Sequence, residues 1–179
     1  MAELSKREEK IKQLKEGKQN LIVILEDIHD PHNAAAVWRS SDAFGVKKVC
    51  LIFDKEIRFN PKRVGKTSSS SANKWIDFEI FKSIEECIKK IKNEGYKIYA
   101  TVLDKEAESL TDVKFNKKTA LMFGNEHRGL SKMAIKLADK KIYIPMRGMV
   151  QSLNLSVTAG ICLYEYTRQN HLLARPRWE

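Results

Sequence analysis

The sequence predicts one α/β domain in which a mostly parallel sheet is covered by helices on both faces. Short apolar runs alternate with stretches of helical periodicity, which is the pattern of repeated strand–helix units. The runs are almost wholly aliphatic, as in Leu21–Glu26 (LIVILE), and strands buried on both faces of a parallel sheet have this composition. A chain of 179 residues has the size of one domain, and no repeat or linker marks a second.

Each apolar run is five to seven residues long and is bounded by polar or turn-forming residues, which is typical of strands. The expected strands span residues 21–26, 47–53, 75–80, 97–103, 119–123 and 141–145. The segment between the fourth and fifth strands is polar and is expected to be a linker without regular structure.

The expected helices alternate with these strands and carry their own start and stop signals. The first is a weak polar helix at 3–17, within an N-terminal extension over residues 1–20. The second spans 31–44, where Asp30 is the N-cap and Pro31 the first helical residue. Ser83 and Glu86 form a capping box for the third helix, which ends at Gly95, and Ser131 caps a short fourth helix.

A long helix is expected to follow the last strand. Leu155, Ala159, Cys162, Leu163 and Tyr166 recur at helical spacing and form one apolar face. A basic tail over residues 168–179 follows, with Trp178 near its end.

The charge of the chain favours a polyanionic partner. The sequence holds 33 Lys and Arg against 23 Asp and Glu, a formal net charge of +10. Charge alone is equally compatible with a basic protein that binds no nucleic acid. The segment from Arg58 to Lys74 has five cations and no acid, and reads as a loop-rich basic surface. The predicted contacts to such a partner are His32, Arg58, Arg63, Lys66, Arg168 and Arg175.

Other features of the sequence argue against a metal site, a membrane protein and a phosphate-binding loop. The three cysteines are far apart and have no metal-ligand spacing with the four histidines, so we expect reduced thiols and no metal site. The N-terminus is charged from the start and the longest aliphatic run is only five residues, so we expect a cytoplasmic protein without a membrane span. A phosphate loop is unsupported, because Leu130 follows the Gly124–Gly129 spacing where a lysine is required.

Three segments carry sequence motifs in a fixed order. The first motif is EDIHDPHNAAAVWRSSDAFGV (26–46), the second is LMFGNEHRGLS (121–131), and the third is IPMRGMVQSLNLSV (144–157). Together they resemble the SpoU branch of the SPOUT RNA methyltransferases, most closely its TrmH-type tRNA (guanosine-2'-O-)methyltransferases. The resemblance implies a deep trefoil knot at the C-terminal end of the sheet, although knots are rare in proteins in general. It also implies S-adenosylmethionine (SAM) as methyl donor, a homodimer, and the D-loop guanosine at position 18 of tRNA as substrate.

The predicted cofactor residues are small or aliphatic side chains at strand ends and loops, where open α/β sheets bind ligands. They are Thr101, Leu103, Gly124, Ile144, Met146, Ser152 and Leu153. For isolated aliphatic residues such as Ile144 and Leu153 a core position would be the simpler interpretation. The resemblance places them against the cofactor.

Arg39 is the residue predicted to carry the reaction. By the resemblance, the matching arginine activates the ribose 2'-hydroxyl. A guanidinium group, with a pKa of about 12.5–13.8, is a poor general base, so stabilisation of the adjoining phosphate and of the forming alkoxide is easier to explain. An ion pair with Asp42 or Asp27 is the structural alternative.

Four polar residues complete the predicted catalytic set: Asn33, Glu126, Ser152 and Asn154. Asn33 can hold Arg39 or the RNA backbone, Glu126 can brace Arg39 or accept from a loop amide, and one of Ser152 and Asn154 is also expected to cap the last helix. Two other functions stay open: 2'-O-methylation of ribosomal RNA, and RNA binding without catalysis. The wide apolar face of the last helix, to which Leu163, Tyr164 and Tyr166 add, predicts the homodimer independently.

Overall fold

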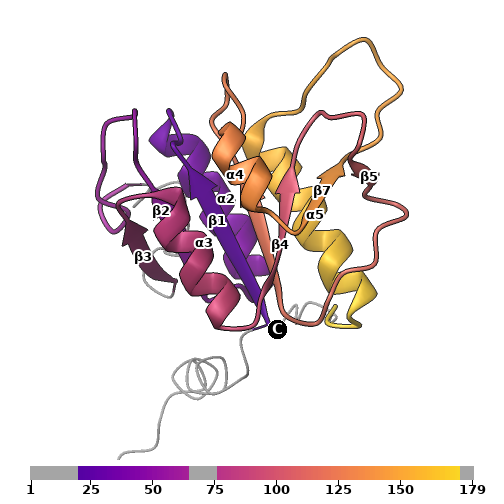
Figure 1. The fold of residues 1–179 in the computed structure, drawn as a ribbon, viewed down its shortest axis with the longest axis horizontal. Helices are drawn as coiled ribbons and strands as arrows, with labels where there is room; N and C mark the ends of the chain where they lie inside the picture. The colour runs from indigo at the N-terminus through magenta and orange to yellow at the C-terminus, as the bar shows by residue number, and fades with distance from the viewer. Residues whose placement is uncertain (1–19, 65–75, 174–179) are drawn as a thin grey trace, which may run out of the picture.

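The computed structural model describes residues 20–64 and 76–173 (Figure 1). The predicted helix at 3–17, the RNA-contact candidates Lys66 and Arg175, and Trp178 lie outside these residues. The described strands are β1 (Leu21–Glu26), β2 (Lys48–Ile52), β3 (Asp77–Phe81), β4 (Lys97–Thr101), β5 (Glu108–Ser109), β6 (Thr119–Phe123) and β7 (Lys140–Tyr143). The described helices are α2 (Pro31–Ala43), α3 (Ile84–Asn93), α4 (Lys132–Leu137) and α5 (Leu155–Gln169).

The strands form one seven-stranded sheet in the order β3-β2-β1-β6-β4-β7-β5, and every neighbouring pair is parallel. The predicted parallel α/β fold is therefore confirmed. All six predicted strands form, and some of them begin or end one or two residues away from the expected bounds. The prediction was wrong for the polar linker, because Glu108 and Ser109 pair with β7 as β5.

Two layers of side chains separate the sheet from its helices, as predicted. Leu21, Val23 and Leu25 of β1 share a core with α2 and α5, whereas Ile22 and Ile24 share the opposite core with α3 and α4. This alternation follows from the two-residue period of a strand. Figure 1 shows α3 and α4 in front of the sheet and α2 and α5 behind it. All five residues of the predicted apolar face of α5 are buried.

The helix boundaries match their sequence signals. Asp30 accepts from His32 N–H at α2, Ser83 from Glu86 N–H at α3, and Ser131 from Ala134 N–H at α4. Gly95 follows α3 with a φ of +84°, a left-handed conformation that favours glycine. The predicted capping box is only half formed, since the Glu86 carboxylate accepts from Lys82 N–H.

The connection from β4 to β5 spans β7. Thr101 at the end of β4 and Glu108 at the start of β5 both lie opposite Ile142 of β7, on its two sides. Residues 102–107 therefore cross β7 at one level without running back along the sheet. Parallel neighbours normally need a much longer return, and this short link suffices because β5 begins where β4 ends. We name residues 102–107 the crossing loop.

Candidate active site

A cavity of about 910 Å³ opens at the carboxyl ends of β6, β4 and β7, the end at which open α/β sheets bind ligands. All seven predicted cofactor residues line it, and so do Asn33, Glu126 and Asn154. Its volume is at the upper end of the range for small-molecule sites, and its wall combines aliphatic side chains with loop backbone. Such a wall fits a nucleoside-containing cofactor such as SAM.

Gly124 shapes this cavity by letting two backbone segments approach each other. A Cβ atom on Gly124 would lie 2.2 Å from the carbonyl carbon of Gly129 and 2.3 Å from the nitrogen of Leu130. The close approach forms a tight loop in which Asn125 and Gly129 exchange backbone hydrogen bonds of 3.1 and 2.9 Å. The loop needs glycine at this position before any ligand is considered.

A chain of hydrogen bonds joins the three sequence motifs at the cavity. The Glu126 carboxylate accepts from His29 N–H at 2.9 Å, from Asp30 N–H at 3.2 Å and from Asn33 Nδ2 at 3.0 Å. Asn154 Nδ2 in turn donates to Asn33 Oδ1 at 3.1 Å. The first motif is thus held from both sides, and Asn33 is fully oriented.

The same contacts decide the charge of Glu126. Burial alone would raise its pKa, but the hydrogen bonds from Asn33 and from backbone amides, including those of His29 and Asp30, outweigh burial and hold the pKa below its usual value. Glu126 is therefore a carboxylate at neutral pH. Glu126 was predicted either to brace Arg39 or to accept hydrogen bonds from loop amides, and the structure shows the second. Asn154 also performs the predicted capping of α5, accepting from Ser156 N–H at 2.8 Å.

A second polar cluster, which the sequence did not reveal, stabilises the loops beside this site. Asp27 follows β1 with a φ of +59°, and its Oδ1 accepts from the amides of residues 54, 55 and 56. Arg128 Nη2 lies 2.8 Å from Asp27 Oδ2 and 2.7 Å from Glu56 Oε1. The cluster ties the loop after β1 to the loops after β2 and β6. The acidic pair Glu26–Asp27 at the end of a buried strand was the available signal.

Further wall residues come from positions that sequence reasoning passed over. They include Val102, Phe123, Leu130, Ile142, Thr158 and Cys162. Thr158 and Cys162 follow Asn154 at successive i+4 steps on α5, so helical periodicity extended from the third motif could have found them.

Arg39 lies apart from this cavity. It stands on the exposed side of α2 and is absent from the described residues that line the cavity. His32 shares the exposed side of α2, and Arg58 and Arg63 are exposed on the loop after β2. Arg168 is also exposed, but its guanidinium already binds Glu165 Oε2 at 2.8 Å and Oε1 at 2.7 Å. An ion pair between Arg39 and Asp27 was the structural alternative. In the structure the guanidinium that binds Asp27 belongs to Arg128.

The described residues offer no group of three or more His, Cys, Asp or Glu side chains arranged to hold a metal ion. Within the same residues no helix has both the length and the apolar composition to cross a bilayer. All three cysteines are buried free thiols, and burial raises the pKa of Cys162 in the cavity wall to about 12.

Comparison with known proteins identifies the family to which this fold and these motifs belong. The family model described as the SpoU rRNA Methylase family matches residues 20–164. The chain belongs to this SpoU methylase family. Its similarity to a tRNA (guanosine(18)-2'-O)-methyltransferase of Thermus thermophilus is 38% identity over 170 residues, which is 92% of this chain and 84% of the relative.

Solved structures of SpoU-type enzymes agree. The TrmH/SpoU tRNA modifying enzyme of A. aeolicus superposes with a TM-score of 0.79 at 35% identity, over 92% of this chain and 84% of that one. An AdoMet-bound rRNA methyltransferase from Sinorhizobium meliloti superposes with a TM-score of 0.77 at 26% identity, over 88% and 59% of the two chains. The SpoU fold is thus shared by neighbours that act on different RNAs.

Proposed function

We propose that this chain is a SAM-dependent methyltransferase of one domain that modifies the ribose 2'-hydroxyl of guanosine 18 in the D-loop of tRNA, in the cytoplasm. The observation that carries the proposal is the hydrogen-bonded chain from Glu126 through Asn33 to Asn154 at the cavity. It joins the three family motifs at the ligand end of the sheet. The relatives named for guanosine 18 of tRNA support the choice of substrate.

The residues of the chain divide the work between binding and chemistry. SAM supplies an electrophilic methyl group on its sulfonium. Leu103, Ile144 and Leu153 would form the apolar wall for its adenine, and the loop after Gly124 would offer backbone donors and acceptors to the base edge. Glu126 holds the amides of His29 and Asp30 and fixes Asn33. Arg39, on the same helix as Asn33, would bind the adjoining phosphate and stabilise the negative charge that develops on the 2'-oxygen as its proton passes to water and the methyl–sulfur bond breaks.

A homodimer completes this site in the proposal. The position of Arg39 outside its own cavity supports a site that is built from two subunits. An exposed apolar strip on α5, formed by Val157, Ile161 and Tyr164, supports an interface on that helix. Leu163 and Tyr166, which the sequence suggested as surplus apolar surface, are instead buried in the core of their own chain.

The C-terminal segment forms a deep trefoil knot in the proposal. The crossing loop supports it, because β7 runs between β4 and β5 while residues 102–107 link these two strands across it. Residues 144–154 then run from the end of β7 to α5 beside the cavity.

Ribosomal RNA is the second candidate substrate. The description of the matching family and a 35% identical 23S rRNA (guanosine-2'-O-)-methyltransferase of Coxiella burnetii favour it. Binding of RNA without catalysis is the weaker alternative, since Arg39, Asn33, Glu126 and Asn154 are all present.

The test is methyl transfer by the purified protein from radiolabelled SAM, in the presence of a metal chelator, to tRNA and to ribosomal RNA fragments. Transfer to unmodified tRNA should be lost when position 18 carries 2'-deoxyguanosine. Transfer that persists on the deoxy substrate, or that occurs only on ribosomal RNA, contradicts the proposed substrate. No transfer to any RNA despite SAM binding favours the non-catalytic alternative.

A further inference from the structure

The crossing loop forms one wall of the cofactor cavity and has few backbone ties. The cavity is lined by Val102, Leu103, Asp104 and Lys105, and Leu103 is 67% exposed. Backbone pairing to β7 holds the start of the loop through Val102 N–H to Ile142 O, and resumes at Glu108. Between these points the backbone hydrogen bond from Ala107 N–H to Asp104 O lies within the loop. The position of Leu103 therefore depends on side-chain contacts.

Lys141 of β7 supplies those contacts. Its Nζ lies 2.9 Å from Asp104 Oδ2 and 2.7 Å from Glu106 Oε2. Asp104 also restrains the backbone of the loop, because its Oδ1 accepts a hydrogen bond from Glu106 N–H at 3.0 Å and so fixes the turn. One ammonium group thus holds two carboxylates on the loop segment that follows Leu103.

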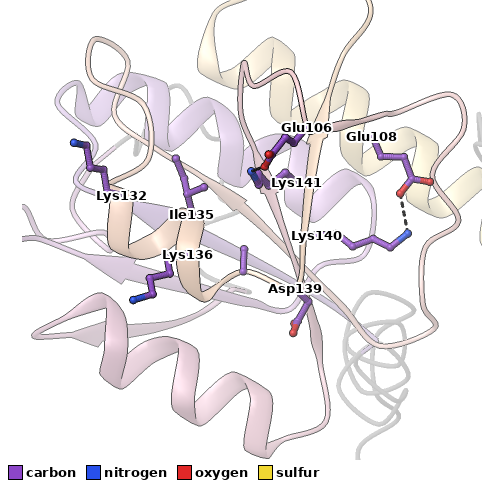
Figure 2. Close-up of a pocket in the computed structure, with 9 residues that line it drawn as sticks. Glu106, Glu108, Lys132, Ile135, Lys136, Asp139, Lys140 and Lys141 are labelled. Atoms are coloured by element: carbon purple, nitrogen blue, oxygen red, sulfur yellow. Dashed lines mark hydrogen bonds and ion pairs between the residues drawn. The ribbon is translucent and has the colours of Figure 1, made fainter.

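Lys141 does this from outside the cofactor cavity. It lines a separate cavity of about 560 Å³ between α4 and the loop, whereas Ile142, the next residue, belongs to the core on the opposite face of the sheet. Figure 2 shows Lys141 beside Glu106, and Lys140 joined to Glu108 farther along. Since Lys141 is absent from the described lining of the cofactor cavity, its structural effect on a bound cofactor would pass through the loop.

We propose that Lys141 is a positioning residue for the cofactor, which latches Asp104 and Glu106 so that Leu103 stands as the wall of the adenine slot. The inference rests on the proposed function of the cavity. Exposed ion pairs each change an equilibrium by about two- to fivefold, so the latch is weak enough to open for cofactor exchange and strong enough to measure.

The chain provides a matched control for the test. Lys140 makes an ion pair of 2.8 Å with Glu108 on the same strand, but Glu108 is not part of the cofactor wall. We would compare Lys141→Met, Lys141→Arg, Glu106→Gln and Lys140→Met. Calorimetry gives the dissociation constant of SAM, and initial rates give kcat and the KM values for SAM and tRNA.

Lys141→Met should weaken SAM binding and raise the KM for SAM by about three- to tenfold, with kcat at saturating SAM and the KM for tRNA unchanged. Glu106→Gln should show part of this loss, Lys141→Arg should restore most of it, and Lys140→Met should bind SAM as the parent does. SAM carries a cationic sulfonium, so removal of a nearby ammonium would by itself leave binding equal or tighter. A loss therefore reports the position of the loop.

Equal SAM affinity in Lys141→Met and the parent overturns the inference, and so does an equal loss in Lys140→Met. Thermal melting of every variant separates a displaced loop from an unfolded chain. Glu106 is 80% exposed at its side chain, so Glu106→Gln tests the latch even if Lys141→Met is unstable. Failure of the parent protein itself to bind SAM would instead refute the proposed function.

Discussion

Arg39 differs from the other predicted catalytic residues in having no place in the wall of its own cavity. Arg39→Ala should therefore leave SAM affinity nearly unchanged. Methyl transfer should fall by about 100- to 1000-fold, the usual cost of removing one charged donor from a transition state. Single-turnover rates and SAM calorimetry measure the two quantities separately. Arg63 is an exposed arginine on the loop after β2, so Arg63→Ala is the control and should turn over normally at saturating tRNA.

Asp27 makes stability depend on acid. Burial alone would raise its pKa, but the amides of residues 56, 55 and 54 and the Arg128 guanidinium outweigh burial, so the pKa lies below its usual value of 3.8. A depressed folded-state pKa contributes stability above the unfolded pKa, and this stability is lost as pH falls through the folded pKa. The contribution is thus complete at neutral pH and disappears in acid below about pH 3.8.

Asp27→Asn tests this, since asparagine also tolerates the left-handed backbone at this position. Urea unfolding at neutral pH should show a loss of about 1–3 kcal/mol, because the amides and Arg128 lose a charged partner. The difference from the parent should shrink as the pH is lowered below 3.8. Asp77→Asn, on an exposed strand position, should show no such pattern. A difference that stays constant with pH would show that the charge of Asp27 is not responsible.

At the residue scale, the sequence predicts local contacts and misses distant ones. Asp30, Ser83 and Ser131 cap their helices because a cap needs only its own neighbours. The ion pair of Asp27 with Arg128 joins residues 101 positions apart, so it depends on the sheet order, which no local pattern encodes. The cofactor wall was predictable only because motif resemblance supplied that long-range information.

At the element scale, the tight loop after β6 depends on Gly124. Gly124→Ala would place a Cβ 2.2 Å from the backbone of Gly129, and no flexible side chain can yield there. We expect a loss of unfolding free energy of about 1–3 kcal/mol or more, together with weaker SAM binding as the loop moves into the cavity. Thermal melting and calorimetry measure both.

Gly148→Ala is the matched control for this prediction. Gly148 lies in the third motif, but nothing stands within 4 Å of an added Cβ and its φ is not left-handed. It should melt like the parent. If Gly124→Ala also melts like the parent, the close approach is not a constraint in solution.

The strands show how far periodicity reaches. The runs 21–26 and 119–123 match β1 and β6 at both ends, because every residue of these two strands is buried and the apolar composition therefore extends over the whole strand. The predicted strand at 97–103 ends two residues early, since Val102 and Leu103 turn into the crossing loop. Strand β5 has only two polar residues, so its pairing follows from the position of β7 and not from its own composition.

At the scale of the whole molecule, the exposed strip on α5 predicts a dimer. Tyr164→Glu places a charge among Val157 and Ile161 and should yield monomers in sedimentation at micromolar concentration. Methyl transfer should fall with it, because the proposed site needs Arg39 from the other subunit. Ile57→Glu, at a residue that is 90% exposed on another surface, should remain dimeric and active. A parent protein that is monomeric and active would remove the two-subunit site.

The distribution of cations predicts how RNA affinity responds to salt. Arg63→Ala should weaken tRNA binding and reduce the salt slope by about one unit if the side chain contacts one phosphate. Arg168→Ala should have a smaller effect, because Glu165 already holds its guanidinium and raises its pKa. Filter binding over a series of KCl concentrations distinguishes them. Equal slopes for the two variants would show that the Glu165 pair yields to RNA.

The place of β7 between β4 and β5 also fixes when the cofactor wall can be finished. A ribosome synthesises β4, the crossing loop and β5 before it reaches residue 140, and the described sheet gives β5 no neighbour other than β7. During synthesis the edge of the sheet must therefore wait for a later segment of the chain. Chains that end at residue 139 and have been released from the ribosome should hold β1, β2, β3, β4 and β6 together yet fail to retain SAM. The chain length at which ribosome-bound nascent chains first retain SAM would then show when β7 inserts into the sheet.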